Sequence, residues 1–102
     1  MADQIRLSGP TLKVLKLMLE KPRQGLSGAE FSRTLGIGSG TLYPLLARLE
    51  SASWVKSEWE DVEPSEAGRP RKRFYRLTGQ GQTRARKALA ELQTDAGILV
   101  WN

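Results

Sequence analysis

One stretch decides the fold of this chain: Gly38-Ser39-Gly40-Thr41-Leu42-Tyr43-Pro44-Leu45-Leu46-Ala47-Arg48-Leu49-Glu50. Its leucines at positions 42, 45, 46 and 49 recur at the spacing that places apolar side chains on one face of a helix. The pattern predicts a helix from Ser39 or Gly40 to about Ser51. The opposite face carries small residues, a hydroxyl, a phenol and one cation, where surface helices usually carry long charged side chains. That face is either an ordinary solvated surface or, as we favour, a contact surface formed by Ser39, Gly40, Thr41, Tyr43, Pro44 and Arg48.

The residues before this stretch predict two further helices. Pro10 follows a capping serine and precedes an apolar run, which predicts a helix over residues 10–20. Ser27-Gly28-Ala29-Glu30 is a capping box that begins a second helix, and Leu35-Gly36 ends it because glycine tolerates the left-handed conformation after a helix. Only a short glycine-rich turn then precedes the next helix. This layout is typical of a helix-turn-helix.

After the third predicted helix the pattern changes to strands. Residues 54–59 and 72–77 are rich in aromatic and alternating residues, and the proline- and glycine-containing segment 60–71 between them predicts a loop. Val55 and Trp59 share one side of the first strand, which predicts that this side is buried. Thr78 then caps a last helix with an apolar stripe. The predicted order α-α-α-β-β-α is mostly α with a β-hairpin, an α+β fold of the winged helix-turn-helix type.

Composition narrows the class of function. The chain has 102 residues and a net charge of +5, which fits one small domain with a polyanionic partner. It contains no cysteine and no histidine, so disulfides, thiolate metal sites and the usual general base are excluded. We expect no catalytic residue, no metal and no cofactor. The sequence has neither a run near the ~18 apolar residues of a membrane span nor a secretion signal, which predicts no membrane contact and a cytoplasmic location.

Charges are segregated along the predicted hairpin. Residues 57–68 hold five acids and no base, whereas residues 69–87 hold eight bases and no acid. The bases could be a solvated loop neutralised by those acids, but such bases tend to alternate with acids. We favour contact with phosphates by four bases: Arg69, Arg71, Lys72 and Arg73. Of these, Arg69 is also a candidate for entry into a minor groove. The acidic segment is either a solubilising loop or a means of repelling DNA in the wrong register, and both interpretations stay open.

Two sets of residues have more than one interpretation. Arg48 either contacts a phosphate or pairs with an acid of its own chain such as Glu50. Trp54, Trp59 and Trp101 are more typical of a core or an interface than of a ligand site, because strand and terminal aromatics usually bury area.

Two motifs together are fairly specific. Residues 40–50 read Gly40-Thr41-Leu42-Tyr43-Pro44-Leu45-Leu46-Ala47-Arg48-Leu49-Glu50, and residues 68–78 read Gly68-Arg69-Pro70-Arg71-Lys72-Arg73-Phe74-Tyr75-Arg76-Leu77-Thr78, with Gly81 just after. In this combination the chain resembles the PadR family of bacterial transcriptional regulators over roughly residues 10–95. It departs from the family pattern at Gly28-Ala29, in a short link before the third helix and in a brief C-terminal part, as a small, divergent member would.

The resemblance implies a homodimeric repressor that binds operator DNA, with the third helix in the major groove and the wing on the flanking backbone or minor groove. Residues 1–78 would then be the DNA-binding domain and residues 79–102 the dimerisation part. Two-fold symmetry predicts an inverted-repeat operator. The expected dimer-interface residues are Leu12, Leu15, Leu19, Leu89, Leu92, Leu99 and Trp101.

Two further hypotheses accompany this one. A planar aromatic effector bound at the dimer interface is motivated by the resemblance and by Trp101. The alternative function is a winged helix that contacts protein without specific DNA binding.

Overall fold

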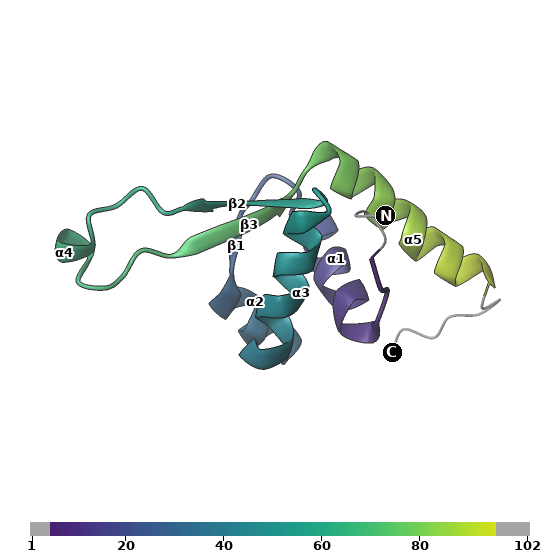
Figure 1. The fold of residues 1–102 in the computed structure, drawn as a ribbon, viewed down its shortest axis with the longest axis horizontal. Helices are drawn as coiled ribbons and strands as arrows, with labels where there is room; N and C mark the ends of the chain where they lie inside the picture. Colours follow the sequence, from purple (N-terminus) through teal and green to yellow (C-terminus); the bar gives the residue numbers. More distant parts are fainter. Residues whose placement is uncertain (1–4, 96–102) are drawn as a thin grey trace.

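A computed structural model describes residues 5–95 of the chain (Figure 1). Within that range the helices are α1 (Gly9–Glu20), α2 (Gly28–Leu35), α3 (Ser39–Ser51), α4 (Pro64–Ala67) and α5 (Gly79–Asp95). The strands are β1 (Leu26–Ser27), β2 (Val55–Trp59) and β3 (Arg73–Leu77). We call β2, β3 and the segment between them the wing. The predicted winged helix-turn-helix class is confirmed, and the structure adds a first strand and a one-turn helix at the tip of the wing.

Helix α1 is the centre of the core. Ser8 caps it, since its hydroxyl oxygen accepts a hydrogen bond of 3.4 Å from the amide of Thr11. The helix lies between α5 on one side and α2 with α3 on the other, and it contacts all three (Figure 1). Its buried residues are Thr11, Leu12, Val14, Leu15, Leu17 and Met18.

This burial corrects part of the expected dimer interface. Leu12 and Leu15 are 7% and 0% exposed within their own chain, so they offer a partner little or no surface. The reason is that α1 packs against α5 as well as against α2, α3 and β3, so most of its apolar surface is buried within the chain. Leu19, Leu89 and Leu92 are half-buried and keep exposed area. Leu99 and Trp101, and with Trp101 the effector hypothesis, lie outside the described residues.

The start of α2 has the predicted capping box. The hydroxyl oxygen of Ser27 accepts from the amide of Glu30 at 3.2 Å, and a carboxylate oxygen of Glu30 accepts from the amide of Ser27 at 3.0 Å. Gly36 ends the helix with a φ of 70°, the left-handed conformation that glycine adopts without strain. A turn of two further residues then leads into α3, so the helix-turn-helix is compact.

The sheet has three antiparallel strands in the order β1-β3-β2. Val55 pairs with Leu77 at the inner end of the wing, and Trp59 pairs with Arg73 at the outer end. The short β1 pairs Leu26 with Tyr75 on the other side of β3. A strand of two residues has no periodicity, which is why the sequence predicted a two-stranded hairpin.

The wing projects beyond the helices (Figure 1). At its inner end Val55, Tyr75 and Leu77 are buried against the helical core. At its outer end Trp59 is 60% exposed, so the prediction that it shares a buried face with Val55 is wrong. The sheet extends past the helices that could bury its face. The alternation of side chains in the sequence does not show at which residue this burial ends. Trp54 is buried in the core, as predicted.

The start of α5 is fixed to the start of the wing. The hydroxyl of Thr78 accepts from the amide of Gly81 at 2.9 Å, which confirms it as a cap, and also donates to the carbonyl of Ser53 at 2.7 Å. Gly81 lies directly on the backbone of Trp54, where a β-carbon would come within 1.9 Å of the carbonyl oxygen. Only glycine allows this close approach.

Candidate nucleic-acid interface

The outer face of α3 is exposed as the leucine spacing predicts. Burial of the four leucines leaves the opposite side of the helix in solvent. All six candidate contact residues of this helix are exposed: Ser39, Gly40, Thr41, Tyr43, Pro44 and Arg48. Pro44 lies inside the helix, where its missing N–H removes the donor that would pair with the carbonyl of Gly40. The exposed face therefore offers a backbone acceptor beside its hydroxyl and phenol groups.

Tyr43 is held against the first residue of α2. A β-carbon at Gly28 would lie 2.2 Å from its phenolic oxygen and 2.7 Å from Cζ, so the ring occupies this place only while residue 28 has no side chain. The phenol is nevertheless 48% exposed. This packing sets the place of a large side chain at the surface, beside the start of α2.

Arg48 makes no ion pair or side-chain hydrogen bond with the residues that the structure describes. The carboxylate of Glu50, the partner considered for it, instead accepts from the hydroxyl of Ser57 at 2.6 Å and lies 3.7 Å from Arg73. The structure therefore does not contain the ion pair between Arg48 and Glu50 that was one of the two interpretations of Arg48.

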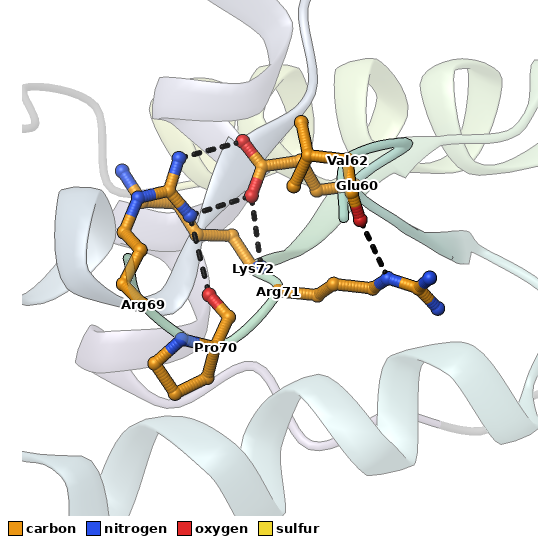
Figure 2. A network of polar contacts seen from close by, with 6 residues as sticks. All are labelled: Glu60, Val62, Arg69, Pro70, Arg71 and Lys72. Carbon is orange, nitrogen blue, oxygen red and sulfur yellow. Dashed lines mark hydrogen bonds and ion pairs between the residues drawn. The ribbon is translucent and has the colours of Figure 1, made fainter. Parts of the chain in front are cut away.

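Arg69 is engaged inside the wing. Its two terminal nitrogens donate to the two carboxylate oxygens of Glu60 at 2.6 and 2.9 Å (Figure 2). The hydrogen bond from Arg69 is the main reason that the pKa of Glu60 is lowered to about 2, and the backbone amide of Lys72 also lowers it. For Arg69 the structure favours neutralisation by an acid over the expected entry into a minor groove, because its guanidinium already forms a two-point pair with the carboxylate of Glu60.

The other bases of the wing keep donors. Arg71 donates from Nε to the carbonyl of Val62 at 2.8 Å, and its two terminal nitrogens take no part in that hydrogen bond (Figure 2). Lys72 and Arg73 are exposed. The guanidinium of Arg73 lies 5.2 Å from the centre of the Trp59 ring, within cation–π range.

These residues meet around one groove. The hollow measures about 380 Å³ and joins the start of α2, the outer face of α3 and the wing. It is lined by Ser27, Gly28, Ala29, Tyr43, Trp59, Arg71, Lys72, Arg73 and Tyr75. Burial raises the pKa of Tyr75, so this phenol stays neutral at physiological pH. The groove combines aromatic surface with three cations and contains no carboxylate among its lining residues.

Four of the predicted contact residues, Tyr43, Arg71, Lys72 and Arg73, are brought together here. The other candidates lie elsewhere on α3 or at the Glu60 pair. Sequence reasoning missed the other five lining residues: Ser27, Gly28, Ala29, Trp59 and Tyr75. The exposure of Trp59 could be predicted only by recognising that the strands of a long hairpin extend beyond the hydrophobic core.

Within the described range no cluster of three or more acidic side chains is arranged to hold a metal ion. Among the helices of residues 5–95, none combines the length and the apolar character that crossing a membrane requires.

Comparison with known proteins identifies the family. Residues 14–87 match the family described as Transcriptional regulator PadR-like family. A PadR family regulator from Eggerthella lenta is 26% identical, with a TM-score of 0.68 over 86% of this chain and 79% of that chain. Two more structures show the same fold at 22% identity. One, from Clostridium difficile, has a TM-score of 0.72 over 88% of this chain and 93% of that chain. The other, from Bacteroides fragilis, has a TM-score of 0.71 over 85% and 82%.

A comparison with curated proteins found no match. The family match spans most of the chain and includes α2, α3, the wing and the first half of α5. The chain therefore belongs to the PadR-like family of transcriptional regulators.

Proposed function

We propose that this protein binds double-stranded DNA in a sequence-specific manner and represses transcription as a homodimer on an inverted-repeat operator. The observation that carries the proposal is the groove that Tyr43 of α3 shares with Arg71, Lys72 and Arg73 of the wing. Aromatic and hydroxyl groups beside a set of cations are suited to a surface that meets base edges on one side and phosphates on the other.

In this arrangement the outer face of α3 enters the major groove. Thr41 and Tyr43 are the side chains proposed to reach base edges, and Ser39 donates to a phosphate at the start of the helix. Arg48, whose side chain has no ion pair or hydrogen bond with the described residues, is proposed to contact the DNA backbone. Few side chains on this face can form hydrogen bonds, so the shape of the DNA contributes a large share of the specificity.

The wing contacts the flanking backbone through Arg71, Lys72 and Arg73. Arg69 is outside this proposed set because Glu60 holds it. Each phosphate neutralised by the wing releases counterions, so binding weakens with added salt, by a log–log slope of about −0.9 per contact.

Dimerisation is proposed to use residues 79–102 together with the exposed parts of Leu19, Leu89 and Leu92. Two subunits related by a two-fold axis place their α3 helices on half-sites about one helical turn, roughly 34–36 Å, apart. Sedimentation of the free protein at several concentrations measures the oligomeric state directly.

Selection of binding sites from random DNA tests the proposal as a whole, because the selected sequences report specificity, symmetry and half-site spacing together. We expect an inverted repeat whose affinity falls steeply with salt. Recovery of no enriched sequence, with equal affinity for all duplexes, would contradict sequence-specific binding and favour a protein partner for the same surface.

A further inference from the structure

Arg73 is held by residues from two other elements. Its Nε donates to the hydroxyl oxygen of Ser57 on β2 at 2.9 Å, and that hydroxyl donates its one proton to Glu50 on α3 at 2.6 Å. A terminal nitrogen of Arg73 lies 3.7 Å from the same carboxylate. The Trp59 ring packs against the guanidinium. The orientation of Arg73 is thus set by a chain of contacts that begins on α3.

This arrangement differs from the Arg69–Glu60 pair of the wing. Arg69 spends two donors on Glu60 in two short hydrogen bonds, whereas Arg73 approaches Glu50 at 3.7 Å, beyond hydrogen-bond distance. Only Nε is consumed, by a neutral hydroxyl. The terminal donors of Arg73 remain for another oxygen, and its side chain is 42% exposed. Glu50 therefore orients this cation without neutralising it by a two-point pair.

We propose that Glu50 and Ser57 are positioning residues that set Arg73 for contact with a DNA phosphate and so tie the placement of the wing to that of α3. The inference rests on the proposed function, since it requires the wing to bind DNA. Glu50 directly follows Leu49, which is fully buried, so the backbone that carries Glu50 is anchored in the core. A restrained arginine loses less conformational freedom on binding than a solvated one.

The test compares DNA affinity of Ser57→Ala, Arg73→Ala and the double variant, on the selected duplex. Ser57→Ala should weaken binding about fivefold, the change that one hydrogen bond of typical net strength gives. In the Arg73→Ala background the same substitution should have no further effect. In a Lys72→Ala background it should keep its full effect, because Lys72 is an exposed wing cation outside this chain of contacts. Ser57→Thr retains the hydroxyl and should restore affinity.

Glu50→Ala separates positioning from charge. Removing an acid beside a DNA-binding surface raises affinity for a polyanion if only net charge matters. The positioning role predicts the opposite, a loss similar to that of Ser57→Ala, with the salt slope unchanged because Arg73 is still present. Thermal unfolding followed by circular dichroism shows whether each variant retains its fold.

Two outcomes overturn the inference in distinguishable ways. If Arg73→Ala weakens DNA binding but Ser57→Ala and Glu50→Ala do not, the positioning role is wrong and the proposed function stands. If Arg73→Ala and Lys72→Ala both leave affinity unchanged, these wing cations do not bind phosphate, so the positioning inference fails together with the wing's part in the proposed function, whereas a selection that enriches no sequence overturns DNA binding itself.

Discussion

The phenolic oxygen of Tyr43 lies against the α-carbon of Gly28, in the space that a β-carbon at Gly28 would occupy. The contact joins the exposed face of α3 to the first residue of α2. It gives a structural reason for a glycine at position 28, next to the point where the family pattern is broken by Ala29. The position of Tyr43 on the proposed DNA-binding surface thus depends on the absence of a side chain at residue 28.

Gly28→Ala should lower DNA affinity with little loss of stability. The new methyl would meet the end of the Tyr43 side chain at 2.2 Å, and the ring can swing away from it, whereas the backbone of residue 28 accepts alanine. We expect the free energy of unfolding to change by less than about 1 kcal/mol. DNA titration and chemical denaturation measure the two effects. In a Tyr43→Ala background the substitution should no longer affect DNA affinity, and an undiminished effect there would exclude displacement of Tyr43 as the cause.

Arg71→Ala should weaken binding to all DNA sequences alike. Loss of one phosphate contact reduces the salt slope by about one unit. The measurement is affinity at several salt concentrations, on the selected site and on an unrelated duplex. Lys13→Ala is the matched control, because Lys13 is an exposed base on α1 outside the groove and its removal changes the net charge equally. Equal slopes for the two variants would show that only net charge matters.

Thr41→Val should instead change which operators are preferred. The substitution retains shape and removes the hydroxyl, so a base pair contacted by Thr41 loses its advantage, by roughly 1–3 kcal/mol of discrimination for a good contact. Affinity for single-base variants of the selected site measures this change. Valine should leave the salt slope as it is. A uniform loss over all variants would place Thr41 on the backbone.

The pH dependence of the wing follows from Glu60. Its pKa is lowered from an ordinary 4.5 to about 2, chiefly by the hydrogen bond from Arg69. Because the folded pKa is depressed, the stabilising contribution of the ionised pair is complete above pH 4.5 and is lost as the pH falls towards 2. The carboxyl resonance of Glu60 in an NMR titration should have its midpoint near pH 2. In Arg69→Gln the midpoint should move back towards 4.5, and an unchanged midpoint would show that another group lowers it.

Gly81→Ala and Gly79→Ala should act in opposite directions. A β-carbon at residue 81 would lie 1.9 Å from the carbonyl oxygen of Trp54, which belongs to the backbone and cannot turn aside. We expect a loss of about 1–3 kcal/mol or more in unfolding free energy. At residue 79 nothing lies within 4 Å, so alanine should stabilise the helix by up to about 1 kcal/mol. Denaturant unfolding of both variants checks this difference, and equal effects would contradict it.

The elements whose signals are local were predictable from the sequence. Ser27 and Glu30 lie three residues apart, and the leucines of α3 lie within two turns, so their patterns are complete in the chain. Segregation of charge likewise indicated the wing cations that line the groove. What local patterns could not show is which surfaces meet: the packing of α5 against α1, the third strand, and the exposed end of the sheet at Trp59.

The basic residues of the wing also show that a sequence pattern does not reveal which groups meet in the fold. Arg69 and Arg71 are two positions apart and equivalent in a sequence pattern. The fold brings Glu60 to the first, whereas the second meets a backbone carbonyl. A distinction of this kind depends on which partners lie across the wing, and charge counting treats both arginines alike.

The outer wing also has a use in protein engineering. The hydrogen bonds and ion pairs described for Glu60 to Lys72 join residues of that segment to one another. Because these contacts stay within the segment, it can be exchanged as one unit, joined to the body at the paired residues Trp59 and Arg73. Because closing a longer loop costs little extra entropy, tips of different length or charge can be grafted there without redesigning the helical body.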